Sequence, residues 1–274
     1  MACVPGMVAA LLAGSCLGGV NAVDGGASQQ ALMNGRAPDA RMHDAVVSLH
    51  RRFGPWVSPS SFCSGTLIAR DVVLTAAHCL DEAAFTANAP GVLDPGSLVV
   101  YVGDAPAQDV TPAFFVVDKT RMHEEYDAGG FENDLGLIRL RDPVPPVLAS
   151  PMPPLPPALA LRQEDIGATL NLAGFGITDD GSSGVKLQVD VRLAGFGCAL
   201  EACPHAGDAN TQISYAQASG GPCFGDSGGP AFLAREAVPY VVGVTSWGDP
   251  WCRRIGVSTR VDAFEPFVRD FLGR

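Results

Sequence analysis

One serine of this chain lies between glycines, in a setting that suits a nucleophile. The segment containing it is Gly225-Asp226-Ser227-Gly228-Gly229. Glycine adopts backbone angles that other residues avoid, so it permits a tight turn here. Such a turn can aim the N–H groups of Gly225 and Ser227 at one point, where they would stabilise a developing oxyanion. Taken alone, the segment also fits an ordinary glycine-rich loop.

A serine hydroxyl is a weak nucleophile at neutral pH, so it needs a histidine to accept its proton. A buried carboxylate must in turn hold that histidine in the right tautomer. His78 precedes Cys79, which could lock its loop, and Asp134 directly precedes the apolar run 135–140. Each is ordinary alone, because core histidines are often structural and an Asp at this place often belongs to a turn.

The position of the histidines excludes one alternative fold. Gly225–Gly229 also has the G-x-S-x-G spacing of α/β-hydrolases, whose catalytic histidine follows the serine. No histidine follows Ser227 in this chain. The serine therefore does not belong to a nucleophile elbow of that fold.

Together, and in the order His78, Asp134, Ser227, these segments resemble the trypsin/chymotrypsin (S1) family of serine proteases. The resemblance extends from Leu32 to the C-terminus. It implies a serine endopeptidase that cleaves protein or peptide substrates through an acyl-enzyme on Ser227. His78 would be the general base and then the acid, and Asp134 would orient it. No cofactor and no metal are implied, and we expect a monomer.

A catalytically silent homologue that serves in binding or adhesion is the competing hypothesis. Such homologues usually lack one of the three catalytic residues, and this chain has all of them. Nucleic acid is not an expected partner, because the formal net charge is −11 and phosphate binding needs a basic face.

The resemblance implies an all-β fold of two six-stranded antiparallel Greek-key barrels packed face to face, with a C-terminal helix. The composition agrees, since 32 Gly and 22 Pro with 17% charged residues suit short strands joined by turns. Strands are expected at 45–50, 62–68, 72–75, 98–102, 114–117, 135–140, 169–173, 186–193 and 238–246.

Apolar residues from Phe264 to Leu272 recur at helical spacing and predict the terminal helix, with Asp262 and Glu265 forming a capping box at its start. The proline-rich stretch from Pro143 to Pro157 is interpreted as a stiff connector rather than a polyproline ligand. We place the first barrel at about 32–142, the linker at about 143–160, and the second barrel with its helix at about 161–274.

An export signal is expected at the N-terminus. Residues 8–17 are apolar or small, and Val20-Asn21-Ala22 resembles a cleavage site, although no basic residue precedes Arg36. We assign residues 1–22 to a signal peptide and 23–31 to a propeptide, and expect a secreted, extracellular or periplasmic protein. Lipidation of Cys16 is a less favoured alternative. The apolar run is too short for a comfortable membrane span.

Six of the eight cysteines remain once Cys3 and Cys16 leave with the signal. An even number in an exported chain predicts disulfides, and the chain has neither a C-x-x-C pair nor an H-E-x-x-H zinc motif. The resemblance implies one bond beside the catalytic histidine and one that braces the specificity pocket. The third pair would form a short local bridge. The implied pairs are Cys63–Cys79, Cys223–Cys252 and Cys198–Cys203.

The resemblance assigns Gly221 to the base of the specificity pocket and Gly248 and Gly256 to its walls. Ser246, Trp247 and Gly248 would pair with the substrate backbone as a strand. Without an Asp at its base, the pocket could not neutralise a buried Arg or Lys of the substrate. A neutral, fairly roomy pocket is predicted, accepting apolar residues in a chymotrypsin-like or elastase-like manner.

Four other residues near these motifs could alter this interpretation. Arg253 or Arg254 would favour an acidic substrate residue if either reached into the pocket, but solvent-exposed loop arginines are expected. His123 and His205 are expected at the surface or in packing.

Activation would follow cleavage between Ala31 and Leu32. The sequence Leu32–Gly35 resembles the family's mature N-terminus, whose new ammonium would pair with the buried Asp226. This pairing would order the oxyanion hole and the pocket. Leu replaces the usual Ile, and Ala31 replaces the usual basic residue, so the activating protease is not expected to be trypsin-like.

Overall fold

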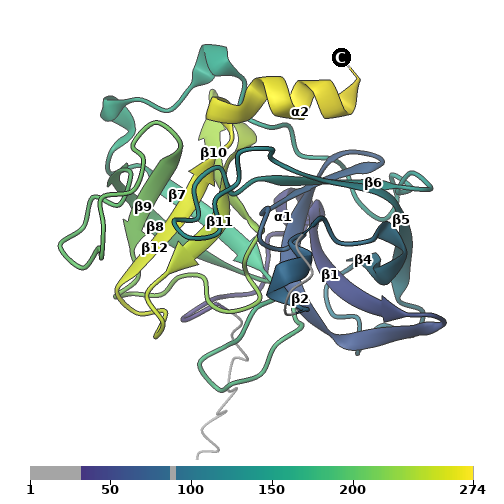
Figure 1. Cartoon of the computed structure of the whole chain (residues 1–274). Helices are drawn as coiled ribbons and strands as arrows, with labels where there is room; N and C mark the ends of the chain where they lie inside the picture. The colour runs from purple at the N-terminus through teal and green to yellow at the C-terminus, as the bar shows by residue number, and fades with distance from the viewer. Residues whose placement is uncertain (1–31, 87–90, 274) are drawn as a thin grey trace, which may run out of the picture.

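The computed structural model describes residues 32–86 and 91–273. It contains two closed antiparallel β-barrels of six strands each, packed side by side, with a helix lying across one end of the pair (Figure 1). This arrangement confirms the all-β fold that the sequence predicts. The expected signal peptide and propeptide, with Cys3 and Cys16, lie outside the described residues.

The first barrel has the strand order β1-β2-β3-β6-β5-β4 and closes where β1 pairs with β4. A short helix, α1 (Ala40–His43), precedes it, and the 3₁₀ turns η1 (Glu82–Ala84) and η2 (Pro95–Ser97) lie between β3 and β4. Its strands are β1 (Val46–Phe53), β2 (Trp56–Ala69), β3 (Val72–Thr75), β4 (Leu98–Val102), β5 (Ala113–Met122) and β6 (Gly136–Leu140).

The second barrel repeats this topology with the order β7-β8-β9-β12-β11-β10, closed where β7 pairs with β10. Its strands are β7 (Thr169–Gly174), β8 (Leu187–Phe196), β9 (Gln212–Ala216), β10 (Pro230–Arg235), β11 (Val238–Gly248) and β12 (Ile255–Arg260).

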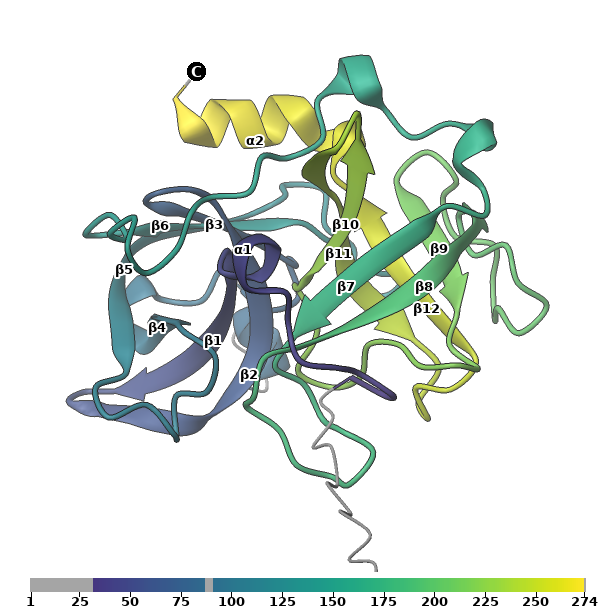
Figure 2. The ribbon, with the colours of Figure 1, turned by 180° about the vertical axis from the view of Figure 1, so that it is seen from behind.

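A proline-rich segment connects the two barrels and contacts both (Figure 2). Met152 N–H donates to Leu67 O of β2 at 2.8 Å, and Leu155 N–H donates to Val241 O of β11 at 2.9 Å. The turns η3 (Pro157–Leu159) and η4 (Gln163–Asp165) end this segment. Backbone bonds to both barrels hold it in place as an extended connector.

The apolar core of the first barrel continues across the interface between the barrels. Its cluster of buried side chains includes Leu49 and Leu74 from the first barrel together with Phe232 and Val244 from the second. A separate cluster fills the second barrel and includes Leu32. Shared apolar packing fixes the relative position of the two barrels, and with it every residue at the interface between them.

The C-terminal helix α2 (Glu265–Leu272) follows the turn η5 (Asp262–Phe264) and buries Phe267, Val268 and Phe271. The predicted capping box is wrong, because the residue before the helix is Phe264 and no side chain caps it. Asp262 instead accepts hydrogen bonds from Leu161 N–H and the Arg260 guanidinium. The added 3₁₀ turn moves the helix start beyond the reach of that carboxylate.

No helix in the part of the chain that the structure describes is long and apolar enough to cross a membrane.

Candidate active site

Three loops bring the predicted catalytic residues to the interface between the barrels. His78 lies in the loop after β3, and Asp134 lies two residues before β6, so both belong to the first barrel. Ser227 lies between β9 and β10 of the second barrel. His78 and Ser227 line one cavity of about 500 Å³, together with Ser246 and Trp247 of β11.

Asp134 is fully buried and accepts three hydrogen bonds. His78 N–H donates to its Oδ1 at 2.9 Å, His78 Nδ1 lies 2.8 Å from Oδ2, and Ser246 Oγ donates to Oδ2 at 2.5 Å. Because an ionised carboxylate only accepts, the hydrogen of the neutral imidazole must be on Nδ1. His78 Nε2 is then the free acceptor, as a base for a serine hydroxyl requires.

The same contacts determine the charge of both groups. Burial alone would raise the pKa of Asp134, but the His78 ring and the bonds from His78 and Ser246 outweigh it and hold that pKa below its ordinary value. Burial alone would lower the pKa of His78, but Asp134 outweighs it and raises that pKa above its ordinary value. Asp134 therefore stays ionised and stabilises a protonated His78.

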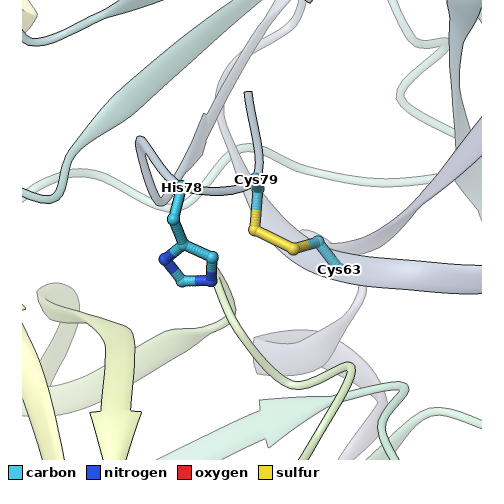
Figure 3. A group of neighbouring side chains, drawn as sticks. All are labelled: Cys63, His78 and Cys79. Carbon is cyan, nitrogen blue, oxygen red and sulfur yellow. A yellow bond between two sulfur atoms is a disulfide. The ribbon is translucent and has the colours of Figure 1, made fainter. Parts of the chain in front are cut away.

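A disulfide holds the loop that carries His78. Cys79 is bonded to Cys63 of β2, and Figure 3 shows the imidazole beside this bond. The three residues are close enough together to suggest metal ligands. Both sulfurs are consumed in the disulfide, however, so neither is available as a thiolate ligand. The cluster serves to position His78.

The loop around Ser227 depends on two glycines with left-handed backbone angles. Gly225 has φ +95° and Gly228 has φ +81°. A methyl group on Gly228 would lie 2.4 Å from Ser64 O, and one on Gly225 would lie 2.9 Å from Gly176 Cα. Both positions require glycine, because their backbone angles are left-handed and because a side chain would collide with neighbouring atoms.

Ser64 of β2 ties this loop to the first barrel. Its N–H donates to Ser227 O at 2.8 Å, and its hydroxyl donates to Gly225 O at 2.9 Å while accepting from Phe175 N–H at 3.0 Å. Sequence reasoning did not identify Ser64, because its role depends on the contact between the barrels.

The N–H groups of Gly225 and Ser227 form no hydrogen bond within the described residues. Their neighbours Asp226 and Gly228 do donate, to Cys223 O and Thr245 O. Two free donors on either side of one peptide unit suit the stabilisation of an oxyanion.

Comparison with known proteins agrees with this geometry. The family model described as Trypsin matches residues 32–268. The chain belongs to the trypsin family of serine proteases. It is therefore a serine endopeptidase of the trypsin/chymotrypsin type.

Similar proteins come from distant organisms. The protease is 28% identical to trypsin eta of Drosophila erecta over 81% of its own length and 83% of that protein. It is 29% identical to a trypsin-like protease of Streptomyces glaucescens, over 89% of its own length and 86% of that protein. It is also 30% identical to brachyurin of Leptuca pugilator, over 68% of its own length and 76% of that protein.

The predicted pocket residues of the protease do not all line the cavity. Gly248 does, whereas Gly221 and Gly256 do not. A methyl group on Gly221 would lie 2.3 Å from Gln217 Nε2, and one on Gly256 would lie 2.9 Å from Gln217 Oε1. Gln217, which sequence reasoning missed, lies against these glycines and lines the cavity.

Neither loop arginine of the protease lines the cavity. Arg253 donates to Asp179 Oδ1 at 3.1 Å, and Arg254 is exposed. Asp249 does line the cavity. Its carboxylate, however, accepts backbone N–H groups of its own loop, including that of Ile255 at 2.9 Å.

Three other histidines of the protease, His43, His123 and His205, do not line the cavity, although His205 packs against Trp247, which does. The ring centroid of His123 lies 5.0 Å from that of Phe264, and the ring centroid of His205 lies 4.9 Å from that of Trp247. His43 is buried with Nε2 at 2.6 Å from Asn171 Oδ1, and it does not line the cavity.

The segment that begins at Leu32 inserts into the second barrel. Leu32 is fully buried, and Met33 pairs with Gly221 through two backbone hydrogen bonds of 3.0 and 3.1 Å. Nearby, the buried Asp226 accepts from the N–H groups of Gly176 and Cys223. Burial raises its pKa to about 7 despite these two bonds. A cation beside Asp226 would remove the cost of ionising it.

Proposed function

We propose that this protein is a catalytically active, secreted endopeptidase in which His78, Asp134 and Ser227 form the catalytic triad. The observation that carries the proposal is the geometry of Asp134, which fixes the proton on His78 Nδ1 and leaves Nε2 free in the cavity that Ser227 lines. A silent homologue would have no need for this arrangement.

The chemistry follows from these positions. Ser227 Oγ attacks the scissile carbonyl carbon while His78 Nε2 takes its proton. The N–H groups of Gly225 and Ser227 stabilise the oxyanion. His78 then gives the proton to the leaving amine, and an acyl-enzyme on Ser227 remains. Water, activated by His78, hydrolyses this ester and restores the free serine.

The preferred substrate residue before the cut, P1, is proposed to be neutral rather than basic. Gly221 and Gly256 supply no charge, and the carboxylate of Asp249 is occupied by backbone donors. Apolar groups of Trp247, Pro250 and the Cys223–Cys252 disulfide line the same cavity. These surroundings favour a chymotrypsin-like or elastase-like preference, because a buried Arg or Lys would have no partner.

Activation is proposed to require cleavage between Ala31 and Leu32. The new ammonium of Leu32 would pair with Asp226 and keep it ionised. The burial of Leu32, the pairing of Met33 with Gly221, and the raised pKa of Asp226 support this step. The protein is proposed to be exported, since its three disulfides suit an oxidising compartment.

A peptide library tests the proposal as a whole. Processed protein should cut after neutral residues, and Ser227→Ala protein with the same N-terminus should cut nothing. Equal activity of the two proteins would contradict the assignment of the nucleophile, and cleavage confined to Arg or Lys would contradict the pocket.

A further inference from the structure

Gln217 follows β9 and contributes to the lining of the cavity that His78 and Ser227 also line. The residue is only 2% exposed. Its Nε2 donates to Pro222 O at 2.7 Å, and its backbone N–H donates to Arg254 O at 3.2 Å. Because a peptide oxygen only accepts, the NH₂ group must face Pro222 and Oε1 must face the other way.

That other side is the space between the glycines of the pocket. A methyl group on Gly248 would lie 3.3 Å from Gln217 Oε1, and one on Gly256 would lie 2.9 Å from it. Within the described residues, no donor is bonded to Oε1. The amide oxygen of this almost fully buried residue thus faces the cavity with its acceptor capacity unused. Leaving such a group unpaired costs about 1–3 kcal/mol when the site closes over it.

The charged groups of the cavity lining are engaged in hydrogen bonds of their own and do not face the pocket glycines. The carboxylate of Asp249 accepts the backbone N–H groups of Arg254 at 2.7 Å and Ile255 at 2.9 Å, which turns it toward its own loop. His78 is bonded to Asp134. The acceptor that lies beside the pocket glycines is therefore a neutral one, the amide oxygen of Gln217.

We propose that Gln217 determines primary specificity by selecting neutral P1 side chains that end in a hydrogen-bond donor, with Tyr and Gln as the best examples. The inference rests on the proposed function and narrows its P1 preference. The apolar walls would hold the body of such a side chain, and Oε1 would accept from its tip. An apolar analogue would leave Oε1 unpaired, and a site built in this way rejects such analogues. Lys and Arg would bury a full charge against a neutral group.

The test compares matched substrates that differ in the terminal donor. We expect kcat/KM to be about 10-fold or more higher for Tyr than for Phe at P1, and for Gln than for Met, from the pairing of one buried acceptor. Gln217→Met keeps the length of the side chain but removes the acceptor, and should bring both ratios near one. Gln188→Met, a buried glutamine of β8 outside the cavity, is the matched control and should keep the wild-type ratios.

Gln217→Glu retains the shape and supplies a second test if the Met variant does not fold. Its carboxylate should raise kcat/KM for P1 Lys relative to Tyr by about 10-fold or more. Labelling by an organofluorophosphonate separates the two proposals. Labelled wild-type protein with Tyr/Phe and Gln/Met ratios near one would overturn the role of Gln217 alone. Protein that neither labels nor cleaves would overturn the proposed function, and this inference with it.

Discussion

Three hydrogen bonds converge on Asp134, and their donors come from both barrels. Two come from His78 of the first barrel and one from Ser246 of the second. Ser246 was expected only to align substrate, so its bond to Asp134 is a contribution that the sequence did not reveal. At the residue scale, the site depends on a carboxylate that stays ionised although it is buried.

The pH dependence of kcat/KM should therefore show the raised pKa of His78. Activity requires neutral His78, so it should fall as the pH drops through a value above 6.5. Asp134→Asn removes the charge and favours the wrong tautomer, and should lower kcat by about 10³- to 10⁴-fold. A pH–rate series on both proteins measures this. Unchanged activity in the variant would contradict the role of Asp134.

Ser64→Ala should lower kcat more than it raises KM. Its hydroxyl donates to Gly225 O and accepts from the buried Phe175 N–H, so its loss leaves both groups without this partner and loosens the oxyanion loop. We expect about a 10-fold loss of kcat, equivalent to about 1.4 kcal/mol. The matched control is Ser48→Ala, because Ser48 is also a buried serine but its hydroxyl is hydrogen-bonded to His50. Equal kcat values for the two variants would show that Ser64 has only a structural role.

At the scale of elements, disulfides hold two of the three loops that carry the proposed triad, those of His78 and Ser227, while strands position all three. Cys223 and Cys252 both line the cavity, whereas Cys198–Cys203 closes a short loop that does not line it. Sequence patterns predicted part or all of each of the six strands of the first barrel, where runs such as β3 and β4 are almost continuously apolar. They did not identify β9, β10 or β12. Those segments mix polar residues or breakers with apolar ones, and pairing with neighbouring strands makes them strands.

Gln217 was not predicted from the sequence for the same reason: its position depends on pairing between strands that a local pattern does not show. It directly follows β9, and only the pairing of β9 with β12 brings its side chain against Gly256. A single sequence records neither contact. The three proposed triad residues could be picked out because each lies in a local motif, and the structure brings His78 and Ser227 to one cavity with Asp134 bonded to His78. Ser64 and Gln217 could not, because their contacts join distant segments.

Replacing each disulfide of the second barrel by a pair of serines should cost different amounts of stability and of activity. Sequence separations of 29 for Cys223–Cys252 and 5 for Cys198–Cys203 correspond to about 3.5 and about 2 kcal/mol of loop entropy. We also expect loss of Cys223–Cys252 to abolish activity and loss of Cys198–Cys203 to reduce it slightly. Chemical denaturation and peptide hydrolysis measure the two effects. Equal losses of activity would contradict the assigned roles.

At the scale of the whole molecule, two barrels of one topology meet along the cavity of the candidate active site. The order 1-2-3-6-5-4 recurs as 7-8-9-12-11-10, although the sequence shows no internal repeat. Topology therefore persists here without sequence similarity. Leu32 packs in the core of the second barrel, and the buried Asp226 directly precedes Ser227. Under the proposed activation, an ammonium at Leu32 would act on the site through Asp226.

The uncleaved chain should lose stability as the pH rises from about 4 to 7. Asp226 has its pKa raised from 3.8 to about 7 by burial, so in this window the unfolded chain releases a proton that the folded chain keeps. Below the window the carboxyl is neutral in both states, and above it the loss is constant. Asp226→Asn should abolish this dependence and raise Tm at pH 8 by about 5 °C. Thermal scans of a Ser227→Ala background, which cannot process itself, measure it. If the Tm of the protein with Asp226 changed between about pH 4 and 7 in the same way as the Tm of the Asp226→Asn variant, the account would be contradicted.

The central claim is that Ser227 becomes a nucleophile once cleavage after Ala31 has made Leu32 the N-terminal residue. Mass-spectrometric mapping of an organofluorophosphonate adduct, with the N-terminus of each labelled molecule determined in parallel, tests it most directly. We predict one adduct, on Ser227, confined to molecules that begin at Leu32. An adduct on another residue, equal labelling of uncleaved chains, or no adduct on molecules that begin at Leu32 would contradict the account.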